Sequence, residues 1–392
     1  MPKYKPHNEE YDYIAYRFAV DFKHDDSFLS YFAIHAGCAR LIYNLLVADE
    51  SDFYKEMGFA LNNNYSDYKD QYPFLKEVDA LVLNYAYRDF KTAMKKFYDK
   101  EAAYPKFHSK RGRQSFTTSI ASRGAVNLRY DRQTHLLHVP KLKTDIHIFQ
   151  HRKIRKGGLL KSATFSRECD GRYFVSLLYE YPKGSTSSAA ERHTEKRTIG
   201  LDMSLEHFYV DSNGDAADYH RRYRETEALL AKEQRRLSHM KKGSNNYNRQ
   251  RLKVARLYSK TKNQRNDFLH KLSYTLIHRY DIICIEALNM KAMSQSLHLG
   301  KSVHDIGWGE FTGLLDYKAS KWGKTVIRVD KYYPSSRTCR HCGNVNHKLK
   351  LSDRLYVCPE CGFLIDRDWQ AAMNIRDEGL RIYQSKTSEQ TA

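Results

Sequence analysis

The sequence lacks a long apolar segment, and it carries few acidic residues for its number of basic ones. No apolar run approaches the roughly 18 residues that a transmembrane helix needs, and residues 1–6 are followed by no apolar signal region. These absences predict a cytoplasmic protein with no membrane partner. Because 41% of the residues are hydrophobic and 13% are aromatic, the chain of 392 residues is expected to fold into roughly two to three globular domains.

The shortage of acidic residues points to a partner. The chain has 66 Lys and Arg residues against 46 Asp and Glu, a formal net charge of +20. Such an excess costs self-repulsion that a polyanion relieves. Residues 232–271 concentrate the excess, with thirteen basic residues and only two acidic ones, Glu233 and Asp267. We expect this segment to line a nucleic-acid channel; the alternative is a solvated helical face.

Cysteine is also scarce, and seven cysteines in a cytoplasmic chain argue against a disulfide framework. Four of them form two Cys-x2-Cys pairs separated by fifteen residues: Cys339, Cys342, Cys358 and Cys361. This spacing predicts one structural Zn²⁺ held by four thiolates, with a redox dithiol as the weaker alternative. Cys38, Cys169 and Cys284 lie in apolar or strand-like stretches, so we expect buried thiols there.

The hydrophobic pattern divides the chain into two parts. Before residue 183 it predicts a strand at 13–22, helices at 28–57 and 73–100, and then strands at 115–120, 125–130, 135–140, 145–150, 159–168 and 173–181. Short strands at this spacing suggest a small barrel that the first strand closes. After residue 197 it predicts strands at 198–203, 208–211, 282–286 and 325–329 and helices at 221–241 and 247–279.

Three carboxylates fall where these elements end or begin. Asp202 and Glu286 each end an apolar strand, and Asp368 lies at the start of a helix, where Asp366 is an alternative as a helix cap. A carboxylate at the end of a buried strand is costly unless a cation neutralises it. Singly each could be a cap or an ion-pair partner. Together they predict a site for two Mg²⁺ or Mn²⁺ ions about 4 Å apart, as in RNase H-like nucleases.

Longer motifs resemble the transposon-encoded TnpB family, the compact relatives of type V CRISPR effectors. Four of them lie in the second part of the chain: GLDMS (200–204), DFLHKLSYTLIHRYDIICIEALNM (267–290), YPSSRTCRHCG (333–343) and CGFLIDRDWQAAMNI (361–375). The first part is similar at GCARLIYN (37–44), YPFLKEV (72–78), 104–116 and VPKLK (139–143). One departure is Gln370, which stands where the family usually has asparagine.

The resemblance implies a multidomain α+β fold, with a small β-barrel (wedge), a helical recognition insertion and an RNase H-like (RuvC) nuclease domain that carries an inserted zinc ribbon. The implied boundaries are 1–24 (first wedge strand), 25–103 (recognition), 104–182 (wedge), 183–196 (linker), 197–330 (first RuvC part), 331–364 (zinc ribbon), 365–380 (last RuvC part) and 381–392 (polar tail).

The resemblance also implies an activity and partners. The chain would be an RNA-guided DNA endonuclease, with a guide RNA from the transposon end and a double-stranded target DNA beside a short flanking motif. Asp202, Glu286 and Asp368 match the family's catalytic positions, which would bind magnesium. Two alternatives stay open: a nuclease-inactive RNA-guided repressor, and an unguided resolvase or transposase of the same fold.

Overall fold

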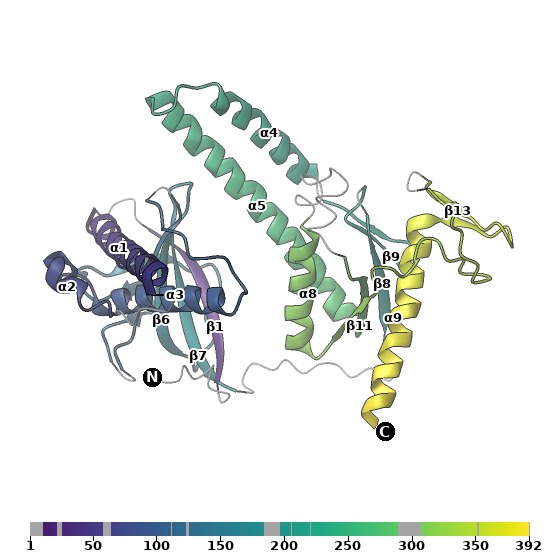
Figure 1. The fold of residues 1–392 in the computed structure, drawn as a ribbon, viewed down its shortest axis with the longest axis horizontal. Helices are drawn as coiled ribbons and strands as arrows, with labels where there is room; N and C mark the ends of the chain where they lie inside the picture. The colour runs from purple at the N-terminus through teal and green to yellow at the C-terminus, as the bar shows by residue number, and fades with distance from the viewer. Residues whose placement is uncertain are drawn as a thin grey trace. The chain divides into compact units, whose positions relative to one another are not determined.

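The computed structural model describes residues 11–21, 26–57, 64–110, 112–122, 125–183, 197–204, 206–219, 221–288, 307–350 and 353–391. The chain divides into two compact units, Met1–Thr186 and Ser187–Ala392. Figure 1 shows both units, and each is described here by itself. Most of the predicted linker at 183–196 lies outside the described residues.

Unit 1 is built on a seven-stranded sheet whose neighbouring strands all pair antiparallel. The strands are β1 (Tyr11–Val20), β2 (Gln114–Ser119), β3 (Arg129–Tyr130), β4 (Leu136–His138), β5 (Ile146–Phe149), β6 (Leu159–Arg167) and β7 (Tyr173–Pro182). Their order is β2-β6-β7-β1-β5-β4-β3. The strand predicted at 125–130 is shorter than expected, because only Arg129 and Tyr130 pair with a neighbour.

The position of β1 corrects the barrel prediction. β1 pairs with β7 from Tyr11 to Ala19 and with β5 at Ala19 and Val20, so it joins two parts of the sheet from its middle. β2 and β3 form the edges of the sheet within the described residues, which leaves a half-barrel. The sequence pattern could not reveal this arrangement, because alternation shows that a strand has one buried face but not which strands flank it.

Unit 1 has two long helices that pack against β2 of this sheet, and two short helical segments lie between them in the sequence. They are α1 (Asp26–Met57), α2 (Tyr68–Gln71), the 3-10 helix η1 (Pro73–Lys76) and α3 (Ala80–Tyr98). The predicted helix after Pro73 begins later, because the Asp79 side chain accepts a hydrogen bond from Leu81 N and caps α3. By length and composition the segment Asp26–Ser51 could cross a membrane, contrary to the expectation from the sequence. However, 56% of its most apolar 18-residue stretch is buried inside the structure, as in the core helix of a globular domain.

Unit 2 contains a five-stranded mixed sheet in the order β10-β9-β8-β11-β12. Its strands are β8 (Thr198–Met203), β9 (Tyr209–Asp211), β10 (Ala216–Ala217), β11 (Ile282–Glu286) and β12 (Thr325–Val329). β8, β9 and β10 pair antiparallel, whereas β11 lies parallel to both β8 and β12. The parallel pairs place the carboxyl ends of β8, β11 and β12 at one edge of the sheet.

Helices cover both faces of this sheet (Figure 1). They are α5 (Asn245–Arg279) and α8 (Trp308–Trp322) on one face and α9 (Arg367–Thr391) on the other. Side chains of β11 are buried on both faces of the sheet. Ile283 and Ile285 pack in one hydrophobic cluster with Phe311, and Ile282 and Cys284 pack in another with Ile375. The last helix reaches Thr391, so the predicted polar tail at 381–392 is helical through residue 391.

The close packing of α9 requires glycine. A Cβ atom added at Gly200 in β8 would lie 2.1 Å from the Ala372 carbonyl oxygen of α9, and one at Gly379 in α9 would lie 2.3 Å from Cys284 Sγ. Cys284 is therefore a buried thiol, as predicted, and Cys38 is buried as well. Cys169 is exposed, which corrects the prediction, because it lies in the turn between β6 and β7.

The basic segment at 232–271 forms most of a helical hairpin of α4 (Arg221–Ser238) and α5. Figure 1 shows α4 lying along the first half of α5. The buried Glu233 side chain links the two helices, because it accepts hydrogen bonds from Gln250 Nε2 at 2.6 Å and Lys253 Nζ at 2.7 Å. Tyr223 and Leu230 of α4 are buried as well, whereas most of the exposed side chains of the hairpin are polar.

Candidate zinc ribbon and carboxylate site

The four paired cysteines converge on one point. Their four Sγ atoms lie within 4.8 Å of one another, with Cys339 and Cys361 3.7 Å apart and Cys342 and Cys358 3.5 Å apart. A tetrahedral site with Zn–S bonds of about 2.3 Å has sulfur atoms about 3.8 Å apart. The geometry therefore fits a structural Zn²⁺ with four protein ligands.

Two tight turns present these sulfur atoms. Gly343 and Gly362 follow the second cysteine of each pair with φ of 75° and 70°, a conformation that other residues adopt at a cost. Gly343 N donates to Cys339 O at 2.9 Å, and Gly362 N donates to Cys358 O at 3.0 Å. The hairpin β13 (Leu355–Val357) and β14 (Leu364–Asp366) carries the second pair. We call residues 331–364 the ribbon.

The ribbon is fastened to α9 by buried amides. Asn374 Nδ2 donates to Ser335 O at 2.7 Å and to Thr338 O at 2.8 Å. Gln370 is fully buried one turn earlier, where Nε2 donates to Ser336 O at 3.4 Å and Oε1 accepts from Arg340 N at 3.5 Å. Both ends of the Gln370 side-chain amide thus contact the ribbon backbone.

The structure places the three predicted carboxylates at one edge of the sheet. Leu201 lies opposite Ile285 in the parallel pair of β8 and β11, so Asp202 and Glu286 occupy the ends of adjacent strands. Asp368 lies in the first turn of α9, which packs across β8. All three side chains are half-buried.

The electrostatics link Asp202 to the other two carboxylates. Burial raises the pKa of Asp202 well above its ordinary value, and the Asp368 and Glu286 carboxylates raise it further. Burial raises the pKa of Glu286 to about 7. Within the described part of the chain, neither the Asp202 nor the Glu286 side chain has a hydrogen bond or ion pair. Two adjacent carboxylates without a partner form a site that favours cations.

Asp368 differs from Asp202 and Glu286 because it forms ion pairs with two arginines. Arg367 donates to Asp368 Oδ1 at 2.8 Å, and Arg354 Nη1 of the ribbon lies 3.7 Å from Oδ2. Arg354 also pairs with Glu206, which follows β8, at 2.9 Å. Asp366 Oδ1 accepts from Trp369 N at 2.8 Å, so Asp366 caps α9. Asp368 raises the pKa of Asp202 more than Asp366 does.

Sequence analysis did not single out Arg354 and Glu206. A lone arginine before a short strand and a glutamate in a loop carry no spacing signal of their own. Their pairing depends on the ribbon folding back beside the end of β8, and only the tertiary structure contains that information.

The fold and the cysteine site define a class of two-unit proteins, in which one unit is an antiparallel half-barrel and the other is an α/β unit that carries a four-cysteine ribbon. The fold is similar to that in a structure titled "Cryo-EM structure of the Cas12f1-sgRNA-target DNA complex", with a TM-score of 0.56 at 12% identity over 91% of this chain and 83% of that one. This likeness concerns the fold alone.

Sequence comparisons identify the family. Residues 176–297 match the OrfB_IS605 family model, described as "Probable transposase", and residues 308–375 match a "Cas12f1-like, TNB domain" model. The chain is 31% identical over 358 residues to a "Putative RNA-guided DNA endonuclease" of Streptomyces pristinaespiralis, covering 88% of this chain and 84% of the relative. It is 27% identical over 375 residues to a "Putative RNA-guided DNA endonuclease InsQ" of Escherichia coli, covering 88% of each. The chain belongs to the TnpB family.

Proposed function

We propose that this protein is a transposon-encoded, RNA-guided DNA endonuclease. Family membership supports the proposal, since relatives that cover most of the chain bear that name. The observation that carries it is the pair Asp202 and Glu286. These adjacent carboxylates form no ion pair within 4.0 Å among the described residues, and they lie at the carboxyl edge of a parallel strand pair. A nuclease-inactive relative needs no such costly arrangement.

Unit 2 is an RNase H-like (RuvC) domain in this proposal. The three consecutive antiparallel strands β8, β9 and β10, followed by the parallel strands β11 and β12, support this assignment. Residues 197–330 and 365–380 form the nuclease domain, and the zinc ribbon at 331–364 interrupts it. Unit 1 supplies the wedge from 1–24 and 104–182 and the recognition helices from 25–103.

Asp202, Glu286 and Asp368 hold the divalent metal in this proposal. Bound Mg²⁺, or Mn²⁺, supplies Lewis-acid chemistry and an activated water for phosphodiester hydrolysis. The protein's own contribution is geometric. β8 and β11 fix two carboxylates side by side, and α9 brings Asp368 to them. Arg367 and Arg354 orient the Asp368 carboxylate.

A guide RNA and a double-stranded DNA target are the proposed partners. The α4–α5 hairpin offers exposed cations that have no acidic partner within 4.0 Å among the described residues: Lys232, Arg235, Arg236, Lys241, Lys242, Arg249, Arg251, Arg256, Lys260 and Lys262. Such a surface suits a phosphate backbone, because each contact releases condensed counterions. Base pairing by the guide would then choose the target sequence.

The decisive experiment is to sequence the RNA that copurifies with the protein and to reprogram it. A guide that matches a DNA duplex should direct magnesium-dependent cutting of that duplex, and a scrambled guide should not. Cutting that needs no RNA would favour an unguided resolvase or transposase. Target binding without cutting, in the presence of Mg²⁺ or Mn²⁺, would favour a repressor.

A further inference from the structure

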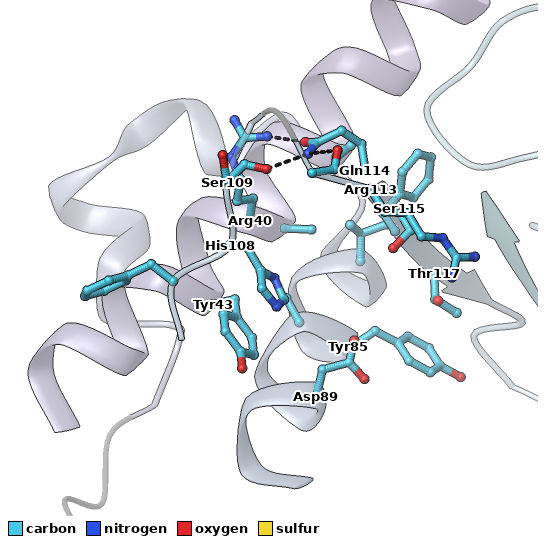
Figure 2. Close-up of a pocket in the computed structure, with 17 residues that line it drawn as sticks. Arg40, Tyr43, Tyr85, Asp89, His108, Ser109, Arg113, Gln114, Ser115 and Thr117 are labelled. Atoms are coloured by element: carbon cyan, nitrogen blue, oxygen red, sulfur yellow. Dashed lines mark hydrogen bonds between the residues drawn. The ribbon is translucent and has the colours of Figure 1, made fainter. Parts of the chain in front are cut away.

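A cavity of about 420 Å³ opens in unit 1. It lies between α1, α3 and the segment at 107–117, as Figure 2 shows. Its volume is in the range of sites for small ligands, about 300–1,000 Å³. Nothing in the proposed cutting chemistry uses it.

One wall of the cavity is flat and fixed. The rings of Tyr43 and His108 stack with their centroids 3.9 Å apart and an interplanar angle of 4°. The Asn44 side chain holds the backbone of His108 from both sides, accepting from His108 N at 2.7 Å and donating to His108 O at 3.0 Å. Tyr43 is buried. The aromatic pair is therefore in place before any ligand binds.

Charged side chains of both signs line this cavity: Arg40, Asp89 and Arg113. Arg40 of α1 donates to Gln114 Oε1, and Gln114 Nε2 donates in turn to Ser109 O at 2.9 Å. This network fixes the guanidinium at one side of the cavity (Figure 2). Asp89 of α3 lies at another side, near Tyr43 and His108, and it has no hydrogen bond or ion pair within the described part of unit 1.

These groups constrain the ligand. The Asp89 carboxylate disfavours a phosphate beside it, and the Arg40 and Arg113 guanidinium groups disfavour a cation. A neutral planar group with both donors and acceptors satisfies both sides. Guanine is such a group, because its N1–H and 2-amino group can donate to one carboxylate while O6 and N7 can accept from one guanidinium.

We propose that this cavity binds one unpaired guanine base of a nucleic-acid strand, with Asp89 reading the donor edge and Arg40 the acceptor edge. The exposed His108 ring, which is stacked on the buried Tyr43, supplies a surface on which the base can stack. An unpaired guanine of RNA and one of DNA share this chemistry. The proposal does not depend on the nuclease assignment, because it concerns binding by unit 1.

The test measures binding of the full-length protein, freed of nucleic acid by a salt wash, to labelled seven-nucleotide strands. The strands are oligo-U and oligo-dT with G, A, C or inosine at the centre. Guanine should bind about tenfold tighter than adenine or cytosine, and inosine, which lacks the 2-amino group, should lose about tenfold. The backbone that binds more tightly identifies the strand as RNA or DNA.

Two variants complete the test. Asp89→Asn should bring guanine to the affinity of adenine, whereas Asp99→Asn at the end of the same helix, outside the cavity, should leave the preference unchanged. If Asp89→Asn fails to fold, the inosine strands still decide the question with the unaltered protein. Equal affinity for G, A, C and inosine on both backbones would overturn the proposal. The Asp202→Ala variant should keep the guanine preference even if it no longer cuts.

Discussion

At the scale of residues, the cost of the carboxylate pair is visible in its pKa values. Both Asp202 and Glu286 are partly desolvated, and the pKa of each is raised. A carboxyl group whose folded-state pKa exceeds its unfolded value destabilises the fold when pH rises above the unfolded pKa. At neutral pH without divalent ions these residues therefore work against folding, as expected of groups retained for chemistry.

This cost leads to a first prediction, for Asp202→Asn and Glu286→Gln. Each variant should lose DNA cutting by several orders of magnitude while keeping RNA and target binding, because shape is preserved and charge is removed. In the absence of divalent ions, Asp202→Asn should also raise the melting temperature. Cleavage assays and gel shifts with a matched target measure the first effect. Retained cutting in either variant would remove that residue from the proposed metal site.

A second prediction concerns Gly200, where backbone approaches backbone. Gly200→Ala should destabilise unit 2 by about 1–3 kcal/mol or more, because its methyl group would meet the Ala372 carbonyl oxygen of α9. Gly313→Ala in α8 is the control: it has open space around its Cβ and should stabilise the helix by up to about 1 kcal/mol. Denaturant unfolding compares them. Equal stability of the two variants would mean that α9 does not pack as closely as described.

Residues also show how far sequence could lead. The spacing of the cysteine pairs predicted a four-thiolate cluster, because local turns determine where these sulfur atoms point. The prediction of a buried thiol at Cys169 was wrong, because its strand-like neighbours did not reveal that it lies in a turn. Gln370 and Asn374 bind ribbon backbone more than thirty residues away in sequence, and no local pattern indicates such a contact.

At the scale of elements, the ribbon and α9 act as one piece. β14 ends at Asp366, α9 begins at Arg367, and Arg367 N donates to Arg354 O at 2.9 Å. Asp368 therefore depends on the ribbon for its position. The order of strands in unit 1 was harder to predict than the strands themselves, since the central place of β1 rests on pairing between residues more than 160 positions apart, such as Tyr13 and Glu180.

The dependence of Asp368 on the ribbon gives a third prediction. Cys358→Ser should lower zinc content, loosen the ribbon and reduce cutting at least tenfold, because Asp368 loses its support, whereas the exposed Cys169→Ser should change none of these. Metal analysis, limited proteolysis and cleavage assays follow the three effects. Full cutting by a zinc-free Cys358→Ser protein would show that α9 holds Asp368 without the ribbon.

At the scale of the whole molecule, the net charge of +20 makes nucleic-acid binding dependent on salt. The α4–α5 hairpin carries much of this charge on its surface. The excess of basic over acidic residues could be predicted from the composition alone. The hairpin that displays it was predicted from the pattern of residues 221–279, because local periodicity determines helices better than it determines strand neighbours.

The fourth prediction tests this surface. Replacing Lys241, Arg249 and Arg256 with glutamine should weaken RNA binding at physiological salt and reduce the slope of log K against log salt concentration by about two to three. Lys271→Gln should have little effect, because Lys271 is paired with Asp267 at 2.7 Å. Filter binding at several salt concentrations gives both slopes. An unchanged slope in the triple variant would exclude the hairpin from the RNA interface.

The direct passage from β14 into α9 sets a limit on shortening this protein for delivery or fusion. Cutting out the metal-bearing module and rejoining the chain would also delete the residues that start the last helix and leave its first turn without an anchor. A smaller version is better sought by trimming the far end of that helix, beyond its contacts with the sheet. Insertions of new cargo are best kept away from residues 331–368.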